Sequence, residues 1–250
     1  MTGKLMLLAV TALAGGIALS AAEEPVIRKM TVEADMTAPP DVSYRNHSAF
    51  SPKNPSTSKW LMLKIEYTPE LSRNFVPEYR LRKGGPAVTF PGWLDDVKLQ
   101  ARVLFETGIL TKGGKPVLGL FTGDTVFQSI KRDGSKHLAL MFVPARLLDR
   151  YCVPGGRNVG KNFFHVEVMM SAKGKVLASA YCNVPGTTPA EKKQSFDQML
   201  KGVPKQLDIR DAVLSRARSP WALLAPDNFD WEDNRKSEET NGSEAGGPLP

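Results

Sequence analysis

Apolar and polar residues alternate in five segments of the chain, with the period of two that half-buried β-strands show. The clearest case is the segment 97–105, in which Val97 and Leu99 face one side while Lys98 and Gln100 face the other. Three shorter segments are apolar on both faces, which indicates central strands. The alternating segments are 30–36, 61–67, 97–105, 164–170 and 176–182, and the shorter ones are 117–121, 125–130 and 137–143.

This pattern predicts a mostly β protein. Seven or eight strands follow one another without a sustained alternation of strand and helix, which favours an antiparallel β-sandwich in one domain. The last two strands are joined by the short connection 172–175, which contains Gly174 and therefore predicts a β-hairpin. No internal repeat is visible in the chain.

Helical signals gather toward the C-terminus. Thr188 followed by Glu191 forms a capping box, and Pro189 takes the first helical position. An apolar face then repeats at helical spacing until Gly202, where the helix should end. The helical predictions are a helix over 189–201, a short helical turn at 144–151 and a second C-terminal helix near 207–217.

The first 22 residues have the features of a secretory signal peptide. Lys4 supplies the positive charge, the apolar region 5–19 follows, and small residues at 20–22 suit a signal peptidase. The apolar region is short for a membrane span, which needs about 20 residues. We therefore expect a periplasmic or secreted protein with no integral membrane span after signal removal. An uncleaved membrane anchor is the alternative.

Composition divides the rest of the chain. Pro, Ser and Asn are frequent in 37–58, and the last residues combine acids, Gly and Pro with few apolar groups, which predicts disorder. The expected divisions are a signal peptide at 1–22, an N-terminal strand with a Pro/Ser/Asn-rich linker at 23–58, a β-sandwich core at 59–188, a helical C-terminal extension at 189–226 and an acidic disordered tail at 227–250.

Charge is distributed unevenly between the body and the tail. The chain holds 33 basic and 26 acidic residues, and seven of the acids lie in 227–250. Setting aside Lys4 and the tail's Arg235 and Lys236 leaves 30 basic and 19 acidic residues in 23–226, a net charge of +11. Such a body attracts anionic surfaces such as lipid headgroups, polysaccharide or nucleic acid. The alternative is a solvated surface with evenly spread charge, since no run of five basic residues occurs.

Two cysteines, Cys152 and Cys182, are the only ones in the chain. In an oxidising compartment such a pair is a candidate disulfide. The bond would close a loop of about 30 residues and stabilise the fold by roughly 3 kcal/mol in the chain-entropy model. Two buried thiols are the alternative.

Motifs for nucleotide binding and for metal binding are weak. The segment 155–161 has the glycine and lysine spacing of a phosphate-binding loop, but Asn162 stands where a Ser or Thr would hold magnesium. A strand pattern follows it in place of a helix, so the segment is predicted to be a basic glycine loop. Two cysteines 30 residues apart and three scattered histidines lack zinc-ligand spacing. We predict no cofactor and no metal site.

Nucleophilic catalysis has no clear signature either. The chain has no nucleophile elbow, and its histidines are His47, His137 and His165. A pair of Cys152 with His165 would lack a third, orienting group. The sequence therefore predicts that the protein is not an enzyme. A hydrolase with dispersed carboxylates stays open, because any two acids can meet in space.

Aromatic residues near the C-terminus are candidates for partner binding. Trp221, Phe229 and Trp231 lie in the Pro-containing segment 219–233, which leads into the acidic tail. This segment could dock on the protein's own sandwich or on a partner, and the sequence leaves both alternatives open.

Five segments carry a resemblance to known proteins: WLMLKIEY at 60–67, WLDDVKLQARVLF at 93–105, MFVPARLLDRY at 141–151, the hairpin at 164–182 and SPWA at 219–222. They resemble a group of secreted proteins of verrucomicrobial bacteria. That group in turn resembles immunoglobulin-like β-sandwich proteins encoded beside type IV pilus assembly genes. The resemblance covers roughly 60–225 and implies an immunoglobulin-like fold and a role beside pilus or secretion machinery. No functional residue is carried over, because the family pattern marks none.

Together these observations predict a non-catalytic envelope protein with an immunoglobulin-like antiparallel β-sandwich, one or two C-terminal helices and a disordered acidic tail. Its expected function is protein–protein interaction in the assembly of a pilus or secretion apparatus. One alternative is a basic surface binder of anionic polymer, such as envelope polysaccharide or DNA. The other is an envelope hydrolase.

Overall fold

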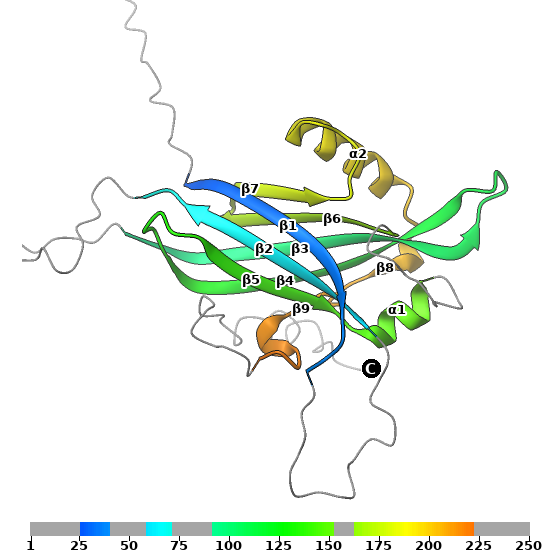
Figure 1. The fold of residues 1–250 in the computed structure, drawn as a ribbon. Coiled ribbons are helices and arrows are strands. Elements are labelled where there is room, and N and C mark those ends of the chain that lie inside the picture. Colours follow the sequence, from blue (N-terminus) through cyan, green and yellow to red (C-terminus); the bar gives the residue numbers. More distant parts are fainter. Residues whose placement is uncertain (1–25, 41–58, 72–91, 153–162, 223–250) are drawn as a thin grey trace, which may run out of the picture.

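The computed structural model describes residues 26–40, 59–71, 92–152 and 163–222. The predicted signal peptide, most of the linker, the glycine loop at 155–161 and the acidic tail lie outside these residues. Within them the protein is mostly β and consists of two sheets packed face to face, with two α-helices (Figure 1). Neither helix is long and apolar enough to cross a membrane.

The first sheet has the order β1-β2-β5-β9 and the second the order β7-β6-β3-β4-β8. All neighbouring strands are antiparallel except β4 and β8. The strands of the first sheet are β1 (Ile27–Thr37), β2 (Trp60–Pro69), β5 (His137–Val143) and β9 (Leu214–Ser215). Those of the second are β7 (Lys175–Cys182), β6 (Phe164–Ala172), β3 (Trp93–Leu110), β4 (Pro116–Lys131) and β8 (Asp208–Ile209).

This strand order is that of an immunoglobulin-like sandwich. Strands β1, β2 and β5 occupy the places of the A, B and E strands, while β7, β6, β3 and β4 occupy those of G, F, C and C′. The predicted fold class is confirmed. The sandwich also uses strands on both sides of the expected core range 59–188, because β1 pairs along its length with β2 and the short β8 and β9 join the sheets near the C-terminus.

The core consists of the apolar side chains that the alternation places on the inner faces. Leu63 and Ile65 of β2 and Leu99 and Val103 of β3 are fully buried. At the far end of β3, Phe105 stacks on Phe121 with 4.1 Å between ring centroids. The period of two therefore identified the buried faces of β1, β2, β3 and β6 before any register was known, whereas Val176 on the predicted apolar face of β7 is exposed.

Helix α2 (Pro189–Lys201) confirms the predicted C-terminal helix at both ends. Both hydrogen bonds of the capping box are present between Thr188 and Glu191. The helix covers the outer face of the second sheet, where Phe196 is fully buried in a small second apolar cluster (Figure 1). The other members of that cluster are Leu104, Leu120 and Val184, with Tyr181, Met199, Leu200 and Val203 packed around them.

The remaining helical predictions have different outcomes. The turn at 144–151 is helix α1 (Ala145–Tyr151). The prediction of a second C-terminal helix near 207–217 was wrong. This stretch contains the short strands β8 and β9, and a short 3-10 turn overlaps each of its ends. Helical geometry is interrupted at Asp211, which has a positive φ of 52°. Ile209 and Leu214 on either side pair with the edges of the two sheets instead.

The predicted strands 117–121 and 125–130 are parts of one strand, β4. Gly123 lies between them and does not break the strand. Its lack of a side chain lets the chain pass close by: Thr122 accepts hydrogen bonds from the backbone N–H groups of Ala212 and Val213, at 2.8 and 3.1 Å. A Cβ atom on Gly123 would lie 1.9 Å from the Val213 carbonyl oxygen.

We expect Gly123→Ala to lower the free energy of unfolding by about 3 kcal/mol, because backbone and not a flexible side chain would have to move. Denaturant unfolding followed by circular dichroism measures the effect. Gly113→Ala is the matched control, since the nearest atom to its added Cβ is 3.9 Å away. Equal stability of the two variants would contradict the close approach.

Candidate functional site

The two sides of the sandwich differ in how their edges are covered. On one side, β4 and β5 are partly capped by β8 and β9, which pair with two residues each. On the other side, β1 and β7 lie next to each other, and among the described residues neither has a further strand on its outer edge (Figure 1). We call this second side the open side. An edge strand can pair its backbone with a further strand, so the open side is the candidate interaction surface.

Side chains on the open side combine charge with one large apolar group. On β1, Arg28, Glu33 and Asp35 are exposed. On β7, Val176 is 57% exposed. Charges on an edge strand oppose pairing with arbitrary strands, so the open side would admit a partner selectively.

A buried polar network lies under α2. Glu167 of β6 has a side chain only 1% exposed and forms an ion pair with the guanidinium of Arg102 on β3. The hydroxyl of Tyr181 on β7 donates a 2.9 Å hydrogen bond to the other carboxylate oxygen of Glu167. From α2, the Phe196 ring centroid lies 5.4 Å from the Arg102 guanidinium carbon, and an Asp197 oxygen lies 4.0 Å from one of its nitrogens.

This network fixes the helix to the sheet. Burial and the hydrogen bond to Glu167 raise the pKa of Tyr181 well above its usual range, so the phenol stays a donor. Each oxygen of Glu167 has a partner, as a buried carboxylate requires. The sequence analysis did not identify the network, because Arg102 and Glu167 lie 65 residues apart and meet only through the β3–β6 register.

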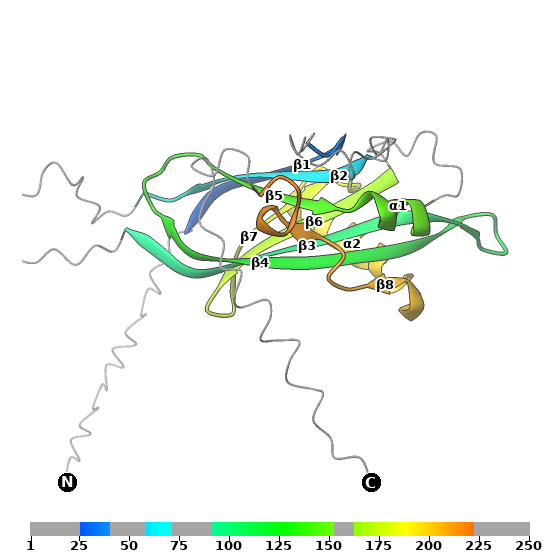
Figure 2. The same ribbon diagram turned by 90° about the horizontal axis from the view of Figure 1, so that it is seen from below.

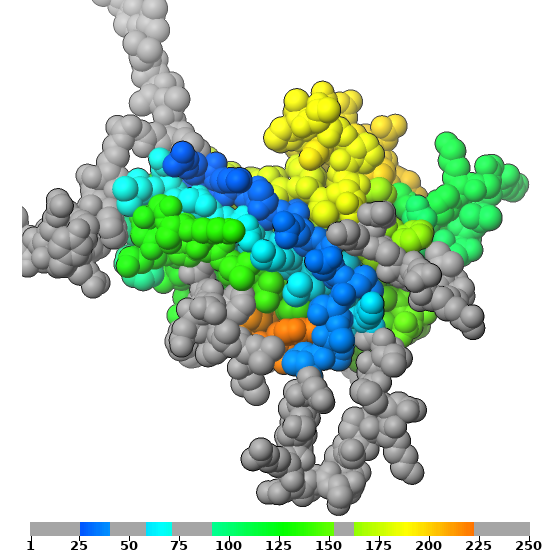
Figure 3. All heavy atoms as spheres, in the orientation of Figure 1, coloured from blue at the N-terminus to red at the C-terminus, as the bar shows by residue number. Residues whose placement is uncertain are grey.

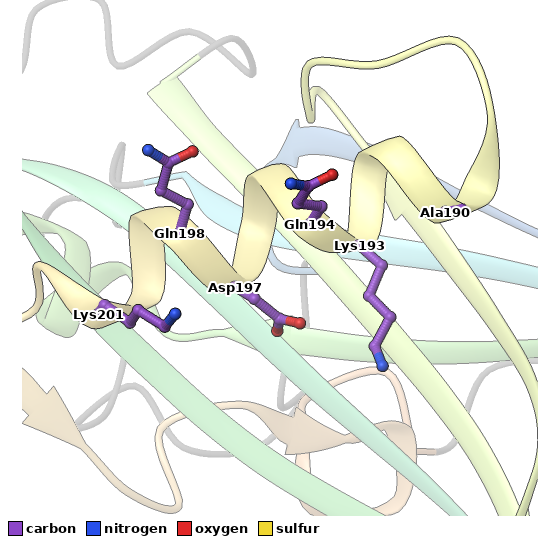
Figure 4. A pocket seen from close by; sticks show the side chains of 6 residues that line it. All are labelled: Ala190, Lys193, Gln194, Asp197, Gln198 and Lys201. Atoms are coloured by element: carbon purple, nitrogen blue, oxygen red, sulfur yellow. The ribbon is translucent and has the colours of Figure 1, made fainter.

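The exposed face of α2 offers a shallow hollow with mixed charge. Figure 4 shows Gln194 and Gln198 on one side of the helix and Asp197 and Lys193 on the other. The lining residues come from a single helix face, with Ala190 and Lys201 at its ends. No convergent set of polar groups results, so we assign no ligand to this hollow.

The two cysteines are thiols in the structure. Cys152 follows α1 and is buried in the core, while Cys182, at the end of β7, is half-buried against the same core. The disulfide between them stays a prediction. Burial, aided by the charge of Asp149, raises the pKa of the Cys152 thiol to about 12. A thiol of this kind is a poor nucleophile at neutral pH.

We expect Cys152 to resist alkylation in the folded protein under reducing conditions, since both burial and the low thiolate fraction protect it. Mass spectrometry after iodoacetamide treatment measures the labelling, and the Cys182→Ser variant leaves Cys152 as the thiol that can react. Full labelling should follow unfolding in denaturant. Rapid labelling of the native protein would contradict the burial of Cys152.

The histidines in the described residues serve local structure. The same ring nitrogen of His137 lies 3.4 Å from Ser135 Oγ and 3.4 Å from Asp133 Oδ1. In a catalytic triad the acid and the nucleophile contact opposite ring nitrogens. The contacts of His137 with Ser135 and Asp133 therefore belong to the turn between β4 and β5 and do not form a triad. His165 contacts the backbone carbonyl of Asn183. No three His, Cys, Asp or Glu side chains gather as metal ligands in the part of the chain that the structure describes.

Trp221 packs on the protein's own sandwich. Its ring stacks on Phe142 of β5 at 4.2 Å and meets the ring of Trp60 edge-on at 5.4 Å. Arg216 Nη1 donates a 2.8 Å hydrogen bond to the Ala222 carbonyl and holds the turn. Only 9% of Trp221 is exposed, so partner binding at this residue stays a prediction that requires the turn to detach. Phe229 and Trp231, the other two candidates, lie outside the described residues.

Comparison with known proteins gives a match at the level of the fold. No family model matches the chain, and no curated protein matches its sequence. Among solved structures, a crystal structure of a protein from Akkermansia muciniphila, a verrucomicrobe, is similar with a TM-score of 0.53 and 13% sequence identity. The match covers 82% of this chain and 94% of that chain. The likeness therefore supports the sandwich and a weak resemblance to a verrucomicrobial protein, while the specific family is left open.

Proposed function

We propose that the protein is a non-catalytic component of the cell envelope, exported to the periplasm or beyond. It mediates protein–protein interaction in the assembly of a pilus or secretion apparatus. The observation that carries the proposal is the open side, where β1 and β7 lie together without further strands among the described residues. The proposal assigns no catalytic residue.

Strand addition is the recognition mode that this surface supports. A partner strand at the edge of β1 or β7 would form main-chain hydrogen bonds, and alternate side chains would supply selectivity. The resemblance of 60–225 to secreted proteins near pilus genes favours an envelope partner. The similar fold in Akkermansia muciniphila is in keeping with this resemblance.

Site-specific photo-crosslinking in the native host tests the proposal. A photoreactive residue replaces Glu33 on β1 or Val176 on β7, both of which are exposed. We expect either position to crosslink to a pilus or secretion-channel subunit. The same residue at Gln198, on the exposed face of α2, is the matched control and should give no such product.

The identity and the position of the crosslinks decide between outcomes. Products from Gln198 as strong as those from β1 and β7 would remove the open side as the interface. Recovery of no envelope-assembly protein from either strand would contradict the assembly function itself.

A further inference from the structure

The β3–β4 hairpin extends beyond both sheets. The last residue of β3 that pairs with β6 is Phe105, opposite Phe164, so the residues from 106 onward continue only with β4. We call residues 106–118 the arm. Figures 1 and 2 show it projecting from one end of the sandwich, and Figure 3 shows the same projection in space-filling form.

Hydrogen bonds hold the arm in a defined shape. Near its base, the Thr107 hydroxyl donates a 2.7 Å bond to the Val117 carbonyl on the opposite strand. At the turn, the Thr111 N–H donates to the Lys115 carbonyl at 2.8 Å, and the Lys115 N–H donates to the Thr111 hydroxyl at 3.1 Å. Gly114 adopts a φ of +74° there, as a tight turn requires. The tip is therefore preorganised.

The tip of the arm, residues 109–115, exposes two aliphatic side chains next to its turn. Ile109 is 58% exposed and Leu110 is 65% exposed, and they adjoin each other at the end of β3. Neither belongs to one of the two apolar clusters of the fold. Their side chains therefore contribute little to folding stability.

The tip also carries positive charge. Lys112 and Lys115 lie in its turn, and the segment 107–118 contains no acidic residue. Helix α1 lies at the same end of the molecule, since the ring of Tyr151 is 6.1 Å from that of Phe121 near the arm's base. That helix adds the exposed Arg146 and Arg150 against one exposed acid, Asp149; the arm's own acid is Glu106 at its base.

A lipid surface suits this shape better than a protein does. A stable protein interface needs about 800 Å² from each partner, whereas the arm is a narrow two-stranded hairpin (Figure 2) with two exposed aliphatic side chains next to its turn. Insertion into a bilayer needs only a few apolar side chains at the depth of the headgroups, with cations beside them that meet anionic lipid.

We propose that the arm binds anionic lipid bilayers peripherally. Ile109 and Leu110 enter the headgroup region, and Lys112 and Lys115 contact the anionic headgroups. The arm then attaches the sandwich to a membrane surface at one end, while the open side stays accessible. This activity is independent of the proposed interaction at β1 and β7.

Vesicle co-sedimentation tests the proposal. The chain from residue 23 onward is used, because the apolar segment at 5–19 would bind lipid by itself. The probes are phosphatidylcholine vesicles with and without phosphatidylglycerol. We expect binding only with phosphatidylglycerol, a loss of about tenfold or more in Ile109→Asp/Leu110→Asp, and a smaller loss with a weaker salt dependence in Lys112→Gln/Lys115→Gln.

Two controls match these variants in chemistry. Leu71→Asp places an acid at another exposed apolar site, and Lys193→Gln/Lys201→Gln removes two charges from the exposed face of α2. Both should bind vesicles like the unaltered chain, and all variants should keep its circular dichroism spectrum. Equal loss in the controls, binding that is unaffected by the tip variant, or no vesicle binding would each overturn the proposal. A lower sedimentation coefficient of the tip variant without lipid would assign the tip to contact between copies instead.

Discussion

Replacing Arg102 with methionine is expected to lower the free energy of unfolding by about 3 to 5 kcal/mol, because Glu167 would be left as a buried charge without its counterion. The Glu167 side chain is only 1% exposed, so its carboxylate has little access to water beneath α2. The hydrogen bond from Tyr181 alone does not neutralise the carboxylate. Loss of the contact with Phe196 should also loosen the helix. Denaturant unfolding and hydrogen exchange of α2 measure the two effects.

Two further variants separate the lost ion pair from a general loss of packing. Lys98→Met is the matched control, because Lys98 pairs with Asp124 at the surface, where both side chains are well exposed and such pairs contribute about 1 kcal/mol or less. Adding Glu167→Leu to Arg102→Met removes the unpaired charge and should restore much of the stability. An Arg102→Met effect no larger than that of Lys98→Met would show that the pair is not buried in solution.

Trp221→Ala is expected to lower the free energy of unfolding by about 3 to 5 kcal/mol, as large-to-small changes at packed aromatic sites do. The ring fills the space between Phe142 and Trp60, so its loss leaves a cavity beside β5. Thermal and denaturant unfolding measure the change. Trp93→Ala is the control, because that side chain is 52% exposed.

The outcome also bears on partner binding by the C-terminal segment. A strongly destabilised Trp221→Ala variant would mean that any loss of partner capture reflects unfolding of the segment. A variant as stable as Trp93→Ala would instead show that the Trp221 ring leaves the sandwich readily and can meet a partner.

Local sequence patterns predicted the elements of the sandwich well because each strand has a buried and a solvated face. Lys98 is exposed and Leu99 is buried, as the alternation of polar and apolar residues around them in the sequence predicts. The helix over 189–201 was predicted to the residue, since its capping box and its terminal glycine are local signals. The hairpin turn at 173–174, where both residues have positive φ, is another local signal.

Features that depend on contacts between distant segments were not predictable in this way. The stretch 207–217 has helix-forming residues, yet pairing with β4 and β5 outweighs that preference. The segments 117–121 and 125–130 were predicted as separate strands, and the role of Gly123 between them depends on Val213, 90 residues later. The same holds for Arg102 with Glu167, whose meeting requires the register, and for Trp221, which packs on Phe142 of a strand distant in the sequence.

The position of β8 and β9 has a consequence for how the chain matures. A chain is synthesised from its N-terminus, so β1 to β7 emerge before the residues that cap β4 and β5. Until the segment 208–222 arrives, both edges on that side remain open to other strands, and Phe142 lacks its cover by Trp221. The newly synthesised protein is therefore most vulnerable to aggregation just before its C-terminal segment docks. A chaperone that protects it would act on that side of the molecule.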